Sequence, residues 1–318
     1  MELRKISQLK PGETFVSFFL IRKVECRSTN SGNKYLDLVL SDISGEIPAK
    51  LWDCTPEDES RFAKNMLIKV KGLVVEWQGK KQIKIDRIRQ ASEKDKLDIN
   101  DFVPAAPYPA QEMYTALLAY LERIGHQKLR ETVRLIIGQV EDKLLTWPAA
   151  LHNHHALRSG LLYHTLTMLQ AGEALLQIYT FLNKDLLLAG IILHDIAKIE
   201  EIEANDLGLA SDYSTEGQLL GHIIQGIKII DRAARQVGLE EELSLQLQHM
   251  ILAHHYEPEF GSPKKPMFPE AEVLHYLDIL DARMFDMQKA LSEVDLGDFS
   301  DRVWVLDNRR LYKSTHNK

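Results

Sequence analysis

Histidine and aspartate residues recur in the second half of the chain at intervals close to thirty residues. They are His164, the pair His194-Asp195, His222, the pair His254-His255, and Asp278, with gaps of 30, 28, 32 and 24 residues. Imidazole and carboxylate groups without a thiolate are typical ligands of manganese, iron, cobalt, nickel or zinc rather than of calcium. If each group lies on a different helix or at a helix end, a helical bundle can bring them together in its interior.

The His194-Asp195 pair is the most informative of these groups because of its surroundings. It lies inside the apolar stretch from Leu186 to Ile199. Burying an acid and an imidazole among apolar side chains is costly unless they pair with each other or bind a metal. A buried ion pair without a metal is the alternative interpretation. Four other histidines fit ordinary structural or surface positions: His126, His249, His275 and His316.

These groups resemble a known family. Their order, together with Lys198 in His194-Asp195-Ile196-Ala197-Lys198, resembles the HD-domain metal-dependent phosphohydrolases that bind two metals. Further stretches are similar to the YhaM-type 3′→5′ exoribonucleases: Asn153-His154-His155-Ala156, Gly160-Leu161-Leu162-Tyr163-His164-Thr165, Thr215-Glu216-Gly217-Gln218-Leu219-Leu220-Gly221-His222, and His254-His255 followed by Gly261-Ser262-Pro263. That family also begins with an OB-type domain, so the resemblance spans nearly the whole chain. One departure is Arg158-Ser159-Gly160, where a double glycine is expected.

The resemblance implies two metal sites that share one carboxylate. One ion would be held by His164, His194, Asp195 and Asp278, and the other by Asp195, His222, His254 and His255. Asp281 is the rival of Asp278, because the two lie one helical turn apart and both can face the site. Asp278 is preferred because the family's ligand stands four positions before a small residue, here Ala282. Asp281 would then contact a ligand rather than the metal.

Two metal ions about 3.5–4 Å apart suit a phosphodiester substrate, because they activate a water and stabilise both the attacking and the leaving oxygen. The resemblance implies hydrolysis of single-stranded RNA from its 3′ end to nucleoside 5′-monophosphates. Manganese is the first-choice metal, with cobalt, iron, nickel or zinc as alternatives, and single-stranded DNA is left open as a second substrate. Lys198 lies one turn after His194 and could stabilise charge on the phosphoryl oxygens. His155 and Arg158 are further candidates for phosphate contact.

The elements that must position these groups fall into two parts. Residues 1–90 predict five strands that suit an OB-type β-barrel: Thr14–Cys26, Lys34–Leu40, Gly45–Trp52, Met66–Glu76 and Gln82–Ile88. Residues 91–110 are polar and then contain Pro104, Pro107 and Pro109, which is typical of a linker. Residues 111–318 predict an all-α HD domain from apolar side chains at helical spacing in Met113–Ile124, Lys128–Leu145, Ala156–Tyr179, Lys184–Glu200, Glu216–Val237, Glu240–His255 and Pro269–Glu293.

Charge indicates what the barrel binds. The whole chain carries a net charge of −7, but residues 1–100 hold 19 Lys and Arg against 15 Asp and Glu. OB folds bind single strands with a cationic groove and stacking aromatic rings, so a nucleic acid is the expected partner. Trp77 beside Lys80 and Lys81 is the preferred stacking site. The other candidates are Phe18, Tyr35, Trp52, Lys69, Lys71 and Lys84.

Composition excludes several classes of protein. Two cysteines in 318 residues exclude a disulfide framework and a Cys-rich zinc module. No apolar run approaches the roughly 20 residues of a membrane-spanning helix, and no secretory signal is evident, so a cytoplasmic protein without a membrane partner is expected. Two other functions stay open. One is a phosphodiesterase of cyclic dinucleotides or other small nucleotides, since His254-His255 followed by Gly261 resembles the HD-GYP motif, and the other is a non-catalytic single-strand DNA-binding protein. A homo-oligomer is also left open.

Overall fold

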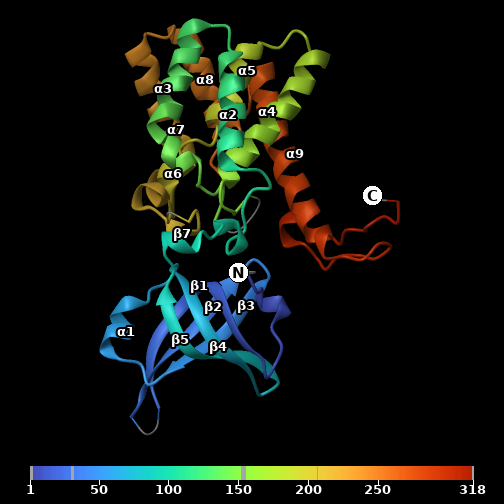
Figure 1. Cartoon of the computed structure of the whole chain (residues 1–318). Helices are drawn as coiled ribbons and strands as arrows, with labels where there is room; N and C mark the ends of the chain where they lie inside the picture. The colour runs from blue at the N-terminus through green and yellow to red at the C-terminus, as the bar shows by residue number, and fades with distance from the viewer. Residues whose placement is uncertain (1–2, 30–31, 152–154, 206, 317–318) are drawn as a thin grey trace. The chain divides into compact units, whose positions relative to one another are not determined.

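The computed structural model of the chain describes residues 3–29, 32–151, 155–205 and 207–316. The chain divides into two compact units, Met1–Pro104 and Ala105–Lys318. Figure 1 shows that the first unit is a β-barrel and the second a bundle of helices. The boundary between them lies inside the stretch 91–110 that the sequence predicts as a linker.

The first unit is a five-stranded barrel with one short helix. Its strands are β1 (Thr14–Ser28), β2 (Lys34–Asp42), β3 (Gly45–Trp52), β4 (Leu67–Trp77) and β5 (Lys80–Gln90), and the barrel closes in the order β1-β2-β3-β5-β4. Of the neighbouring pairs, only β3 and β5 run parallel. Helix α1 (Pro56–Arg61) follows β3, between the predicted strands Gly45–Trp52 and Met66–Glu76. Thr55 caps this helix, because its hydroxyl accepts a hydrogen bond from the backbone N–H of Asp58.

Strand alternation and turn chemistry explain why these residues form a barrel. The leucines at alternate positions of β2 are buried inside it, as the period of two along a strand requires. The β4–β5 connection is the two-residue turn Gln78-Gly79, with φ angles of 51° and 74°. Such turns match the twist of the strands that they join. The turn is shorter than the gap between the predicted strands Met66–Glu76 and Gln82–Ile88, because Lys80 already pairs with Trp77.

The stretch that follows the barrel is more ordered than its composition suggests. It contains two 3₁₀ turns, η2 (Glu93–Asp95) and η3 (Ile99–Asp101). The guanidinium of Arg89 donates two hydrogen bonds to the carboxylate of Asp95, which ties the chain back to β5. Phe102 and Val103 are buried. Apolar side chains next to the prolines therefore hold part of the expected linker in place.

The second unit is built around one helix that is apolar on every side. Its helices are α2 (Ala110–Glu122), α3 (Gln127–Leu144), α4 (Gly160–Ile178), α5 (Lys184–Leu193), α6 (Lys198–Glu201), α7 (Thr215–Val237), α8 (Glu241–Ala253) and α9 (Pro269–Ser292). Every residue of α5 from Leu186 to Leu193 is buried, and α5 contacts α2, α3, α4, α8 and α9. A helix without a polar face must lie in the core. The end of α5 is therefore a position from which polar residues enter the interior.

Three features of this unit differ from the predicted run of helices. The predicted helix Lys184–Glu200 is broken into α5 and α6 by a turn at residues 194–197, and a small hairpin follows, β6 (Ile202–Ala204) and β7 (Ala210–Tyr213). These strands are too short to show a period in the sequence. Beyond α9 the chain forms an arm that Figure 1 shows leaving the end of that helix.

No helix among the described residues is both long and apolar enough to cross a bilayer.

Candidate metal centre

The bundle brings together the histidine and aspartate residues that the sequence singles out. They are His164 on α4, His194 and Asp195 in the turn after α5, His222 on α7, His254 and His255 at the end of α8, and Asp278 on α9. Except for His255, which is partly exposed, each has at most 8% of its surface exposed. Five separate segments of the chain therefore contribute to one buried cluster of polar side chains.

Hydrogen bonds to the backbone set which nitrogen of three of the imidazoles faces the centre. Nδ1 lies 2.9 Å from the carbonyl oxygen of Ile191 in His194, 2.7 Å from that of Ile251 in His254, and 2.7 Å from that of Phe260 in His255. A carbonyl oxygen can only accept a hydrogen bond, so Nδ1 carries the proton in each ring. Nε2 then presents a lone pair, which is the form of histidine that binds a metal.

The first group of candidate ligand atoms surrounds Nε2 of His164. This atom lies 3.2 Å from Nε2 of His194 and 3.2 Å from Oδ1 of Asp278, while Nε2 of His194 lies 3.3 Å from Oδ2 of Asp195. Adjacent ligands of an octahedral ion bound at about 2.1 Å are about 3 Å apart, so these separations fit a metal. Burial alone would lower the pKa of His164, but Asp278 and Asp281 raise it to about 9. A metal at this point would take the place of that proton.

The second group surrounds Oδ1 of Asp195. This atom lies 3.4 Å from Nε2 of His222 and 3.7 Å from Nε2 of His254, and the ligand atoms of these residues and His255 all lie within 4.8 Å of one another. In the part of the chain that the structure describes, Oδ1 of Asp195 and the two Nε2 atoms are buried without a hydrogen-bond partner. An unsatisfied buried polar atom costs about 1–3 kcal/mol, and one cation would satisfy all three. Burial and the adjacent His254 lower the pKa of His255 to about 4, so it is neutral at pH 7.

Asp278 and Asp281 contact opposite sides of the His164 ring. Oδ1 of Asp278 lies on the Nε2 side, whereas Oδ2 of Asp281 lies 2.7 Å from Nδ1. The same oxygen of Asp281 lies 2.8 Å from Nε2 of His155. Asp281 is therefore placed to orient two imidazoles, and Asp278 lies on the side of the candidate ligand atoms.

A lysine and a glutamate on α6 contact the centre from another side. Nζ of Lys198 donates a hydrogen bond of 2.6 Å to Oδ2 of Asp195. Burial alone would raise the pKa of the Asp195 carboxyl, but Lys198 and His194 hold it well below its usual range. Glu201 accepts hydrogen bonds of 3.0 Å from both the backbone N–H and Nδ1 of His222. Sequence reasoning missed Glu201, although its position one turn after Lys198 could have suggested it.

His155 and Arg158, the other predicted phosphate contacts, take different places. His155 is buried, with its ring 4.1 Å from that of Phe285 and its Nε2 on Asp281, a placement suited to supporting the centre. Arg158 is half-buried, and its carbonyl oxygen accepts from the N–H of Ala106. The motif residues Asn153 and His154 lie outside the described residues.

The departure from a double glycine has a local explanation. Ser159 has a φ of 60°, in the left-handed region where glycine is favoured. Its hydroxyl donates a hydrogen bond of 2.6 Å to the carbonyl of Leu145. Gly160 has no such latitude, because a Cβ there would lie 2.0 Å from the carbonyl oxygen of His155. Serine is thus tolerated at one position of the pair and excluded at the next.

The barrel carries a candidate stacking surface on β2 and β3. The rings of Tyr35 and Trp52 lie 4.8 Å apart, and Nζ of Lys50 lies 5.1 Å and 5.4 Å from their centroids. Lys84 is the partner of Lys50 across the β3–β5 ladder. Lys50 was missed in the sequence, although alternation along β3 places it on the same face as Trp52. This surface combines aromatic rings with cations, which suits single-stranded nucleic acid.

The residues predicted at the β4–β5 hairpin are only partly available. Trp77 is 67% exposed beside the turn, next to Lys80. Nζ of Lys81 instead donates to the backbone carbonyl of Leu9. Phe18 is buried beneath Lys69 and belongs to the barrel wall rather than to a stacking surface.

Fold and site together define a class of protein, in which an OB barrel precedes a helical HD-type phosphohydrolase unit with a buried histidine and aspartate centre. Comparison with known families agrees with this class. A family model described as an OB-fold nucleic acid binding domain matches residues 21–91, and the HD domain model matches residues 161–283.

Similarity to individual proteins extends over almost the whole chain. A 3′-5′ exoribonuclease YhaM of Geobacillus sp. is 40% identical over 302 residues, which cover 95% of this chain and 92% of the relative. The YhaM proteins of Halalkalibacterium halodurans and Bacillus subtilis are each 39% identical, covering 98% and 96% of this chain and 96% and 97% of their own lengths. The chain belongs to the YhaM family of 3′-5′ exoribonucleases.

Proposed function

We propose that this protein is a metal-dependent 3′-5′ exoribonuclease that hydrolyses single-stranded RNA to nucleoside 5′-monophosphates. One observation carries the proposal: among the described residues, the unpartnered buried atoms of Asp195, His222 and His254 face one another. Nothing in an ordinary hydrophobic core requires such an arrangement, whereas a cation does. The names of the relatives supply the direction of hydrolysis and the choice of RNA.

Two divalent ions fit the two groups of ligand atoms. His164, His194, Asp195 and Asp278 would hold one ion, and Asp195, His222, His254 and His255 the other. Asp195 would bridge them, because its Oδ2 lies near His194 and its Oδ1 near His222. When bound, such ions lower the pKa of a water and neutralise charge on the phosphate. Nitrogen and carboxylate donors without a thiolate favour manganese, with cobalt, iron, nickel or zinc as alternatives.

The chain's own residues prepare this chemistry. Asp195 is kept ionised by Lys198, so it can bind cations at neutral pH. The ammonium group of Lys198 also brings a positive charge to the centre, where it would stabilise charge on the phosphoryl oxygens. Asp281 and Glu201 fix the rings of His164 and His222 through Nδ1, which directs Nε2 of both toward the centre.

The barrel would bind the part of the strand that is not being hydrolysed. Tyr35, Trp52 and Lys50 offer two rings and a cation, and each stacked base contributes about 1–3 kcal/mol. Stacking does not discriminate between sequences. This lack of discrimination suits an enzyme that shortens a strand stepwise, because it must bind every sequence that it meets. It does not distinguish RNA from DNA either, so single-stranded DNA is the substrate to test beside RNA.

A single RNA distinguishes the proposal from its alternatives. A 5′-labelled RNA with a single-stranded 3′ tail and an internal stem, incubated with Mn²⁺, should shorten progressively and halt near the stem. Opening a stem costs about 1–2 kcal/mol per base-pair step, and the sequence shows no ATP-binding motif. Chelator should abolish the reaction. Internal cuts, release from the 5′ end, or a gel shift without cleavage would each contradict the proposal.

Two further parts of the proposal are the number of metal ions and the cellular compartment. Metal analysis of freshly purified protein should find two transition-metal ions per chain. We also propose a cytoplasmic location, because the chain has only two cysteines, Cys26 and Cys54, and therefore no disulfide framework, as is usual for proteins of the reducing cytosol.

A further inference from the structure

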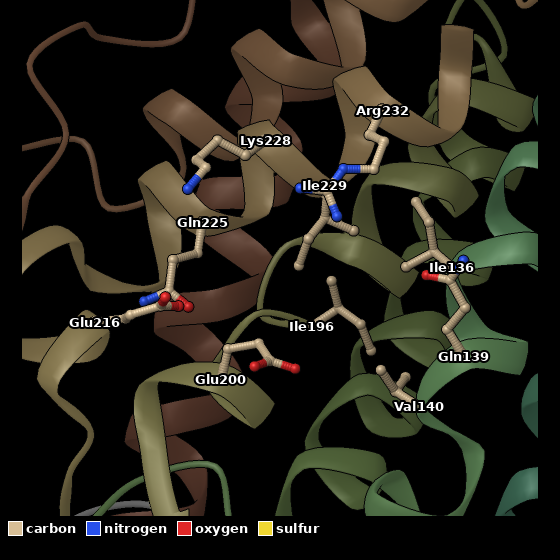
Figure 2. A pocket seen from close by; sticks show the side chains of 10 residues that line it. All are labelled: Ile136, Gln139, Val140, Ile196, Glu200, Glu216, Gln225, Lys228, Ile229 and Arg232. Carbon is tan, nitrogen blue, oxygen red and sulfur yellow. The ribbon is translucent and has the colours of Figure 1, made fainter. Parts of the chain in front are cut away.

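A polar cavity of about 390 Å³ lies in the helical unit between α3, α6 and α7 (Figure 2). Its lining consists of aliphatic, amide and charged side chains: Ile136, Gln139, Val140, Ile196, Glu200, Glu216, Gln225, Lys228, Ile229 and Arg232. None of these belongs to the groups proposed to bind metal. The cavity is therefore a separate candidate site.

Two cations line this cavity without a partner. Lys228 and Arg232 are one helical turn apart on α7, and Figure 2 shows them along one side, with Glu200 on the other. Both side chains are exposed at the mouth of the cavity, and no ion pair or side-chain hydrogen bond joins either of them to a residue that the structure describes. Like charges four residues apart on a helix destabilise it. An anion bound between these two side chains would relieve that repulsion.

A buried amide also faces the cavity with unmet hydrogen-bonding capacity. Gln225 is 4% exposed, and neither Nε2 nor Oε1 of its amide has a partner among the described residues. A side-chain amide offers both a donor and an acceptor, as the edge of a nucleobase does. Aliphatic side chains from three segments, including Ile136, Ile196 and Ile229, supply an apolar wall against which a ring could pack.

We infer that this cavity binds a phosphomonoester of nucleoside size. Its phosphate lies between Lys228 and Arg232, its ring packs on the aliphatic wall, and the Gln225 amide pairs with the polar edge of that ring. Glu200 and Glu216 accept hydrogen bonds from hydroxyl groups of the sugar. Binding of a phosphomonoester is inferred from the lining of the cavity alone. The identification of the ligand as the enzyme's own product, a nucleoside 5′-monophosphate, rests on the proposed function.

The cavity shares structural elements with the metal centre. Helix α6 carries Glu200 on the cavity, and Lys198 and Glu201 at the metal centre. Helix α7 carries His222 as well as the two cations. A ligand in the cavity therefore contacts the same helices that position the groups proposed to hold metal.

Calorimetric titration of the full-length protein with nucleoside 5′-monophosphates tests this inference. A phosphate can also bind at the metal centre, so the titration is repeated with Asp195→Asn, which removes that centre. One nucleotide should still bind per chain in Asp195→Asn. Adding Lys228→Ala and Arg232→Ala to that variant should weaken binding at least tenfold. Arg235→Ala is the matched control, because Arg235 lies on the same helix, is exposed and pairs with Asp231.

Two further measurements test the parts of the ligand. Inorganic phosphate and the unphosphorylated nucleoside should each bind at least tenfold more weakly than the nucleotide. Gln225→Leu should weaken binding of the nucleotide but not of inorganic phosphate, and thermal melting shows whether that variant is folded. Loss of all nucleotide binding in Asp195→Asn, or unchanged affinity after Lys228→Ala and Arg232→Ala, would overturn the inference. Neither outcome depends on whether the protein hydrolyses RNA.

Discussion

The barrel and the helical unit place their polar chemistry in opposite positions. The barrel has an apolar interior and carries Tyr35, Lys50 and Trp52 on its outer surface. The helical unit does the reverse, with imidazoles and carboxylates buried inside a large apolar cluster. Recognition of any single strand needs exposed rings and charge, whereas stabilising charge during hydrolysis needs preorganised groups shielded from water.

The two arrangements differ in how much each residue depends on its neighbours. On the barrel, the stacking residues contact one another and solvent. In the helical unit each imidazole is held through its second nitrogen, by Asp281, by Glu201 or by a backbone carbonyl. Substitutions in the helical unit should therefore have large and coupled effects, and those on the barrel smaller and nearly independent ones.

Asp195→Ala should have the largest effect. Removing the carboxylate that both groups of ligand atoms share should release both ions and lower kcat on the order of a thousandfold or more. Metal analysis and single-turnover hydrolysis of a labelled RNA measure the two consequences. Asp142→Ala, an exposed aspartate on α3, is the control and should retain both ions. Full activity of Asp195→Ala would refute the mechanism.

Asp278→Asn and Asp281→Asn should separate a ligand from the residue that orients it. Asp278→Asn should lose one of the two ions, because its oxygen lies on the Nε2 side of His164. Asp281→Asn should keep both, with about 10–100-fold weaker metal affinity, since loss of an orienting partner typically costs that much. Metal content after dialysis against graded chelator compares them. The opposite order of loss would make Asp281 the ligand.

Glu201→Gln should weaken only the second ion. The amide can still accept a hydrogen bond from His222, but it removes the charge that favours a proton on Nδ1. We expect a loss of about tenfold in affinity, at the low end of the range for such partners. Competition with a fluorescent chelator measures it, with Glu203→Gln on the neighbouring strand β6 as the control. A loss of both ions would show that Glu201 supports the whole centre.

Trp52→Ala should have the smallest effect and leave chemistry intact. Loss of one stacking ring should cost about 1–3 kcal/mol in affinity for a 20-nucleotide strand, while hydrolysis of a short activated diester stays unchanged. Fluorescence anisotropy measures the affinity of Trp52→Ala and Trp77→Ala for this strand, and the larger loss identifies the ring that contributes more to binding. Ile43→Ala is the control for loss of an exposed apolar side chain. Equal affinity in all variants would mean that the barrel is not the nucleic-acid platform.

Local patterns determined the elements of both units. Alternation along β2 and the turn residues Gln78-Gly79 predict a barrel, because strand period and turn conformation are properties of short stretches of chain. The apolar run that contains His194 and Asp195 likewise predicts a buried polar pair. Helix α1 and the β6–β7 hairpin escaped prediction, since a few residues show no usable period.

Only the tertiary structure decided which atoms of the polar side chains contact one another. Helical spacing puts Asp278 and Asp281 on one side of α9, but only the placement of the His164 ring sends one to Nε2 and the other to Nδ1. The same holds for Glu201 and Lys50. Glu201 contacts His222, which is distant in sequence, and Lys50 contacts the rings of Tyr35 and Trp52 on one face of the barrel. A period specifies the direction of a side chain from its own backbone, whereas a contact also depends on where the partner's backbone lies. That second position is set by the packing of the whole unit.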